Sequence, residues 1–181
     1  MPGLKGKLNA TGSLTGTQKQ PHLKASLTGQ NLEYENNQSA SLAADLNISL
    51  SSSYKSHIKL AASDLNIAGN HWKRLTIDGQ GTTDKHQLSL ETDEGPADLQ
   101  LNLSGRWKDS VWTGVLNHLN ITQADIGEWK IQQAVPVSLS SSNAGLDRLC
   151  LESMAKESSA LCVKANWSSI NGIEGAINSQ R

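Results

Sequence analysis

Two expected turns of the sequence match Ser-x-x-Lys, a spacing that activates a serine nucleophile in some acyl-transfer enzymes. They run from Ser52 to Lys55 and from Ser153 to Lys156. In those enzymes the serine lies at the start of a helix and is accompanied by further motifs. Here both matches fall in expected turns of a serine-rich chain, and no set of nucleophile, base and orienting group can be assembled. The sequence therefore predicts no enzymatic activity.

Histidines and one acidic cluster are the residues that could bind a metal ion. The histidines stand singly, without the spacing of metal ligands. The acidic cluster flanks a Gly-Pro turn, and a solvated turn explains it better than a calcium site does. We therefore expect no metal and no other cofactor. The histidines are His22, His57, His71, His86 and His118, and the acidic residues are Glu91, Asp93, Glu94 and Asp98.

Cys150 and Cys162 are the only cysteines of the chain. An antiparallel hairpin that pairs them also pairs Leu151 with Leu161, so that aliphatic side chains share one face and both cysteines share the other. This agreement favours a cross-strand disulfide, which would stabilise the fold by roughly 3 kcal/mol on the chain-entropy model. Two reduced thiols are the alternative. A disulfide would indicate an oxidising compartment, which in a bacterium is the periplasm.

The elements that carry these residues follow a period of two. Leu, Ile or Val recurs at every second position in short runs, separated by Gly, Ser, Asn and Asp. Alternation of this kind predicts strands with one apolar and one polar face, and the short connections favour antiparallel neighbours. The expected strands are 4–15, 22–29, 41–51, 54–63, 64–68, 74–81, 86–92, 97–107, 110–116, 120–123, 128–133, 135–141, 145–152, 160–167 and 172–177.

So many strands exceed what one small core can bury. About 14 strands spaced roughly 4.8 Å apart would form a sheet on the order of 65 Å long, and open sheets beyond about ten strands tend to curl or split. We therefore predict an all-β fold over 1–181, a long antiparallel meander curled into a taco-shaped groove with an aliphatic interior. The residues expected to line it are Leu46, Ile48, Leu60, Ile67, Ile77, Leu90, Leu101, Leu103, Val137, Leu139, Leu151 and Leu161.

The composition agrees with such a groove. Hydrophobic residues make up 36% of the chain, aromatic residues only 4%, and phenylalanine is absent. An interior of Leu, Ile and Val with few rings to fill it suits lipid acyl chains, since each CH₂ moved out of water gains about 0.8 kcal/mol. We expect most of the tryptophans to be ordinary half-buried strand residues, although they could also shape the walls of the groove. They are Trp72, Trp107, Trp112, Trp129 and Trp167.

Charge and hydropathy exclude several classes of protein. The net charge is −1 and the Lys and Arg residues are scattered, which gives no support to nucleic-acid binding. No run of about 18 apolar residues is present, so no segment is expected to cross a membrane as a helix. Met1 leads straight into the alternating pattern without a signal peptide. We therefore expect a single continuous segment of a longer protein, with Met1 added for expression.

The C-terminal third of the sequence resembles the TamB family, the inner-membrane subunit of the translocation and assembly module. The order and spacing of a Trp-x-Gly at Trp112, a Gly-x-Trp ending at Trp129, a Leu-Ser at Leu139 and the two cysteines carry the resemblance. Residues 1–105 share it more loosely, for example in the Leu-Thr-Gly-Thr that begins at Leu14.

This resemblance implies a bridge-like lipid-transfer protein of the AsmA-like superfamily. It would be anchored in the inner membrane of a Gram-negative bacterium and would extend a β-groove through the periplasm. The family is linked to phospholipid transport towards the outer membrane and, with its partner TamA, to the assembly of outer-membrane proteins. The chain would be an interior periplasmic segment of such a protein.

Other interpretations remain open at this point. An ordinary β-sandwich or barrel would pack the aliphatic face on itself, and a Leu101→Arg substitution would then unfold the domain instead of only blocking lipid passage. A secreted β-solenoid passenger or adhesin would also be rich in Gly, Ser and Asn. A third interpretation is chaperone-like pairing of an exposed strand edge with the strands of a client outer-membrane protein. Exposed edges also predict end-to-end self-association of the segment.

Overall fold

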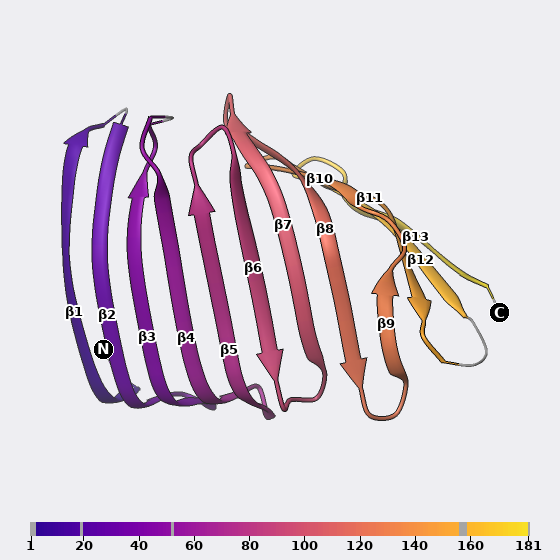
Figure 1. The fold of residues 1–181 in the computed structure, drawn as a ribbon, viewed down its shortest axis with the longest axis horizontal. Helices are drawn as coiled ribbons and strands as arrows, with labels where there is room; N and C mark the ends of the chain where they lie inside the picture. Colours follow the sequence, from indigo (N-terminus) through magenta and orange to yellow (C-terminus); the bar gives the residue numbers. More distant parts are fainter. Residues whose placement is uncertain (1–2, 19, 52, 156–158, 181) are drawn as a thin grey trace.

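The protein forms one antiparallel β-sheet in a simple meander (Figure 1). The computed structural model describes residues 3–18, 20–51, 53–155 and 159–180, and within them no helix is long and apolar enough to cross a membrane. The all-β antiparallel prediction is confirmed. The strands are β1 (Leu4–Thr17), β2 (Gln20–Tyr34), β3 (Asn37–Ser49), β4 (Ser56–Ile67), β5 (Asn70–Gly81), β6 (His86–Asp93), β7 (Asp98–Lys108), β8 (Val111–Gln123), β9 (Gly127–Ile131), β10 (Val135–Ser140), β11 (Asn143–Ser153), β12 (Ala160–Ser168) and β13 (Gly172–Gln180).

Two of the thirteen strands share a single place in the sheet. Both β9 and β10 pair with β8 on one side and with β11 on the other. They are two halves of one strand, interrupted at 132–134. Every pairing in the described sheet is antiparallel, so the alternative of a β-solenoid, which stacks its coils in parallel, is wrong.

Cross-strand pairing aligns the alternating residues in rows that run across the sheet. Because successive side chains of a strand point to opposite faces, each aliphatic row is flanked by a polar row on the other face. One aliphatic row consists of Ala25, Leu46, Ile58, Gly79, Leu88, Leu103, Leu116 and Val135. The polar row beside it contains Ser26, Asp45, Lys59, Asp78, Ser89, Asn102 and His118.

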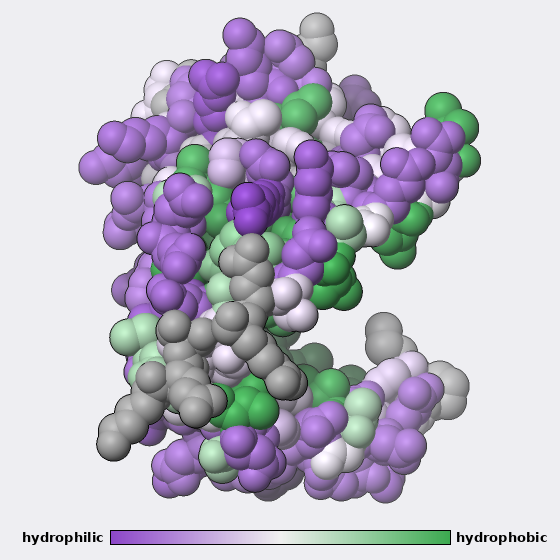
Figure 2. All heavy atoms as spheres, turned by 90° about the vertical axis from the view of Figure 1, so that its right-hand side faces the viewer, coloured by the Kyte–Doolittle hydropathy of each residue, from purple (hydrophilic) through white to green (hydrophobic). Residues whose placement is uncertain are grey.

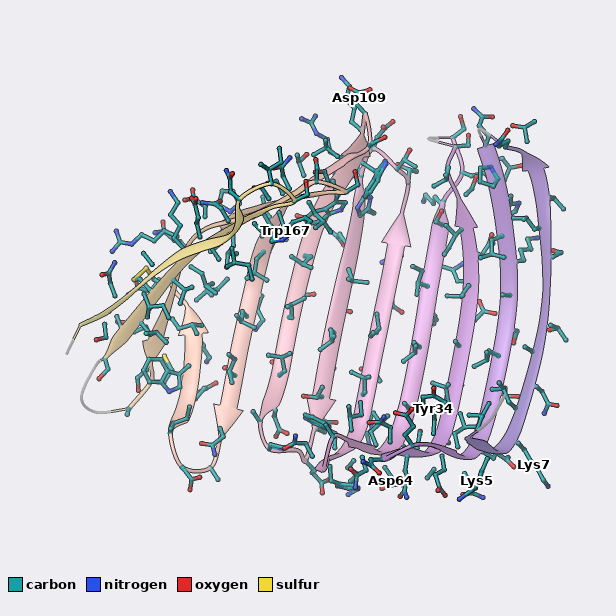
Figure 3. All side chains as sticks on the ribbon, turned by 180° about the vertical axis from the view of Figure 1, so that it is seen from behind. Lys5, Lys7, Tyr34, Asp64, Asp109 and Trp167 are labelled. Atoms are coloured by element: carbon teal, nitrogen blue, oxygen red, sulfur yellow. A yellow bond between two sulfur atoms is a disulfide. The ribbon has the colours of Figure 1, made fainter. Side chains whose placement is uncertain are left out.

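The sheet bends where the regular pairing is interrupted. In the first strands the interruption is marked by Gly6, Asn31 and Asp64, whose φ values are 102°, 48° and 47°. In the later strands register shifts occur between Asn102 and Leu103 and again between Leu146 and Leu149. Irregularities of this kind increase the local bend and twist of a sheet. Figure 3 places Asp64 at the end of the strands that turns away from the main sheet, and Figure 1 shows β10 to β13 at an angle to β1 to β8.

These irregularities also explain where the expected strand boundaries differ from the structure. The segments 54–63 and 64–68 were expected as separate strands but form one strand, β4, which continues through Asp64. The segments 110–116 and 120–123 likewise join as β8, which passes through the register shift against β7. From the sequence, a polar residue that interrupts the alternation is expected to mark a turn between two strands. In the structure it marks a bend within one continuous strand.

The two cysteines lie on adjacent strands and form a disulfide. Cys150 on β11 is paired in register with Cys162 on β12, and Leu151 is paired with Leu161 beside them. The aliphatic pair belongs to the same face as the aliphatic rows, and the disulfide lies on the other face. The bond therefore joins two strands of the last part of the sheet without occupying its aliphatic face.

Reduction of this disulfide should lower the stability of the sheet. The two cysteines are 12 residues apart, and closing a loop of this length contributes about 3 kcal/mol on the chain-entropy model. Urea unfolding followed by circular dichroism should show a lower midpoint when dithiothreitol is present. A Cys150→Ser, Cys162→Ser double variant is the control, because its midpoint should not respond to dithiothreitol. Equal midpoints for the oxidised and reduced wild-type protein would contradict the prediction.

Candidate binding groove

A groove of about 850 Å³ lies between two parts of the curled sheet. One wall comes from the ends of β3 to β8, and the other wall comes from β10 to β13. Ile48 on β3 and Ile173 on β13 both line it, although their strands lie far apart in the order of the sheet. Figure 2 shows the resulting C-shaped outline, with apolar side chains inside the gap and hydrophilic side chains on the outside. The volume falls within the roughly 300–1,000 Å³ of typical ligand sites.

The described lining of the groove contains no Asp, Glu, Lys or Arg. Its polar members are Ser, Thr, Asn, Gln and His residues, and several of them alternate with the apolar ones and belong to the outward-facing rows. A surface of this kind can exclude water from an apolar ligand but has no charge with which to hold an ion. The apolar lining comprises Ile48, Leu50, Ile58, Leu88, Leu103, Trp107, Trp112, Val137, Leu139, Ala144, Leu146, Ala165, Trp167 and Ile173.

The structure places the predicted lining residues in three groups. Ile48, Leu103, Val137 and Leu139 line the groove. Ile67 is 44% exposed and lies beyond the bend at Asp64, next to the turn that joins β4 to β5. The remaining residues share the aliphatic face by register but lie outside the groove lining: Leu46, Leu60, Ile77, Leu90, Leu101, Leu151 and Leu161.

Part of the aliphatic face is closed by its own side chains. Leu116, Leu119 and Val135 form a buried cluster, in which Val135 is only 1% exposed. Leu101 and Leu151 pack against this cluster. The face is therefore not open along its whole length. Leu101 and Leu151 pack only against the small core, whereas Leu103, Val137 and Leu146 contact the core and also line the groove.

Sequence reasoning gave the aromatic contribution to the groove only as the less favoured alternative. Trp107, Trp112 and Trp167 all line it, whereas most tryptophans were expected to be ordinary strand residues. The signal was present in the alternation, because Trp107 pairs with Trp112, Trp112 pairs with Leu139, and these positions belong to one row. Recognising it requires the register of the strands, which the sequence does not supply.

The Asp, Glu, Lys and Arg side chains that the structure describes lie outside the groove lining. Exposed ion pairs join Lys5 to Glu33 at 2.7 Å and Lys73 to Glu94 at 2.6 Å. The pKa of Glu128 is lowered from its ordinary value, first because Lys130 bonds to its carboxylate and then because Asn120 donates a second hydrogen bond.

Among the described residues, no group of three or more His, Cys, Asp or Glu side chains could hold a metal ion. The two Ser-x-x-Lys matches each include a residue outside the described part, Ser52 or Lys156.

Residues 1–178 match the family model for the TamB N-terminal domain. The chain belongs to the TamB family. The match covers nearly the whole chain, so the likeness to TamB that the C-terminal third shows in its motifs extends through the loosely patterned first strands. No solved structure matches the chain closely enough to be counted as similar.

Substitutions at Leu101 and Leu139 should distinguish, by their effects on stability, a core position from a groove position in this TamB-family sheet. Leu101→Arg places a charge against the buried cluster, and an unpaired buried charge costs on the order of 3 kcal/mol or more. Leu139 lines the groove but is 50% exposed, so Leu139→Arg should cost less than about 1 kcal/mol because its charge reaches water.

Urea unfolding of both variants measures this difference. Gln100→Arg is the matched control, since Gln100 is exposed on the opposite face of the strand that carries Leu101. Its midpoint should stay close to that of the wild-type protein. Equal destabilisation by Leu101→Arg and Leu139→Arg would mean that the groove is part of a closed core.

Proposed function

We propose that this segment of a TamB-family protein shields the acyl chains of phospholipids during transport between the inner and outer membranes. The observation that carries the proposal is the groove between two walls of one sheet, whose described lining contains no Asp, Glu, Lys or Arg. Lipid is moved passively on this proposal. The apolar lining replaces the bilayer interior around the chains, and no catalytic step is involved.

The free energy of transfer from water favours a bound lipid whose acyl chains lie in the groove while its head group stays in water. Each CH₂ that leaves water gains about 0.8 kcal/mol, so a chain of ordinary length gains several kcal/mol when its whole length is covered. The gap visible in Figure 2 opens to one side, and hydrophilic side chains cover the outer surface around it. A phospholipid could therefore keep its polar head group in water while its chains lie against the apolar wall.

Family membership and the disulfide support a periplasmic location. The TamB family is associated with the inner membrane and with the outer-membrane partner TamA. A disulfide between Cys150 and Cys162 is consistent with an oxidising compartment. We propose that the full-length protein is anchored in the inner membrane, extends this sheet into the periplasm, and acts with TamA.

Assembly of outer-membrane proteins is a second role that we propose from family membership, with strand pairing as its mechanism. Within the described sheet, β1 pairs only with β2, and β13 pairs only with β12. An edge of this kind can add a strand from another chain through backbone hydrogen bonds. The client would be a strand of an outer-membrane protein, and in the isolated segment the same edges would support end-to-end self-association.

Native mass spectrometry of the purified protein, with analysis of the extracted lipid, tests the lipid-binding proposal. We expect phospholipid to remain bound to the wild-type protein and to Gln100→Arg. Leu139→Arg should lose it while remaining folded, because a guanidinium group in the groove would have to be desolvated by the acyl chain. Absence of lipid from the wild-type protein, or full retention by a folded Leu139→Arg variant, would overturn the proposal.

A further inference from the structure

One tryptophan of the groove lies flat on the sheet instead of standing up from it. Side chains of a strand normally project roughly perpendicular to the sheet, so Trp112 would be expected to extend into the groove. Its ring instead lies over Gly105 and Gly114, which face each other on β7 and β8. A Cβ atom added at Gly105 would lie 2.5 Å from the ring, and one added at Gly114 would lie 2.4 Å from it. Only glycine leaves this space at both positions.

A hydrogen bond holds the indole ring by its nitrogen. Trp112 Nε1–H donates to His86 Nε2 at 2.6 Å, and His86 Nδ1 lies 2.9 Å from the carbonyl oxygen of Thr82. An indole nitrogen can only donate, so Nε2 of His86 must be the acceptor and Nδ1 must carry the proton. His86 is therefore held as the neutral Nδ1–H tautomer, between a donor on one side and an acceptor on the other.

The turn that carries Thr82, the partner of His86, is itself hydrogen-bonded to the sheet. Thr82 and Lys85 close the turn between β5 and β6 through a backbone bond of 2.8 Å, and the amide of Trp107 donates to the carbonyl of Thr83 at 2.7 Å. The imidazole is thus attached to a turn that is bonded to the end of β7. His57, Lys55 and Lys85 lie around the neighbouring surface, and no carboxylate is among the described residues there.

We propose that Trp112 sets the width of the groove and that His86 is its positioning residue. The assignment rests on the proposed function, because it concerns the space available to an apolar chain. With its ring flat, Trp112 forms part of the wall between Trp107 and Leu139, its partners in the row. An indole released from His86 returns to the upright orientation of an ordinary strand side chain and occupies the space of the ligand.

Substitutions at His86 and Gly105 test this assignment in the whole chain. His86→Leu removes the acceptor, whereas the side-chain oxygen of His86→Gln can still accept the bond from Trp112. Gly105→Ala pushes the ring off the sheet, and a Gly105→Ala, Trp112→Leu double variant removes the ring that blocks the groove. The probe is cis-parinaric acid, a fluorescent fatty acid, and circular dichroism shows that each variant is folded.

We expect His86→Leu and Gly105→Ala to bind the probe about fivefold more weakly, the factor that corresponds to one hydrogen bond. His86→Gln should bind it with nearly wild-type affinity, and the double variant should bind it more tightly than Gly105→Ala does, because the displaced ring is gone. Fluorine NMR of protein labelled with 5-fluorotryptophan, assigned through Trp112→Phe, should show a shifted Trp112 signal in His86→Leu and an almost unchanged one in His86→Gln.

The outcomes separate this assignment from the proposed function. If the wild-type protein does not bind the probe, the proposed function fails and the assignment fails with it. If the probe binds and the affinity is the same in His86→Leu, Gly105→Ala and the wild-type protein, the assignment alone is overturned. A Trp112 signal that moves equally in His86→Leu and His86→Gln would also overturn it, because hydrogen bonding would then not position the ring.

Discussion

The strands of this protein carry most of their aliphatic side chains on one face, and within the described residues no second layer of structure covers that face. In an ordinary domain a helix or another sheet would bury it. Here the sheet has to curve around its own aliphatic face, so burial is incomplete almost everywhere. Among the residues that the structure describes, the buried apolar ones are few: Ala62, Leu116, Leu119, Val135 and Cys162. The fold therefore depends on the backbone ladder and on rows of half-buried neighbours more than on a compact core.

A curved sheet requires interruptions in the ladder of backbone hydrogen bonds. In this protein the interruptions lie in lines across neighbouring strands. Asn31 and Asp64 adopt left-handed backbone conformations that Asn and Asp tolerate better than most residues. Leu32, directly after Asn31, then lies against Gly29 on its own strand, where an added Cβ would meet its side chain at 2.5 Å. A second line of irregularities includes the break between β9 and β10. The groove lies at the end of β4 away from Asp64, where β3 and β13 supply facing walls.

The sequence predicted the features that depend on neighbouring residues. Alternation identified the strands and their aliphatic faces, and the spacing of Cys150 and Cys162 identified the register of one hairpin. Features that depend on the summed registers of several strands could not be predicted. Leu101 and Leu139 have the same pattern in sequence, yet one packs against the buried cluster and the other lines the groove. The difference arises from the bends between their strands, which no local pattern specifies.

The contact between Trp112 and His86 is another feature of the groove that local sequence patterns could not predict. The two residues belong to β8 and β6, with β7 between them, and meet because opposed glycines leave the intervening surface flat. Most apolar side chains of the wall can change rotamer without losing a hydrogen bond, so they adapt to whatever lies against them. An apolar track with adaptable walls lets a chain slide, since no position is bound much more tightly than the next. Trp112 differs because a hydrogen bond fixes its orientation, and a fixed wall is what defines a constant width along an otherwise adaptable path.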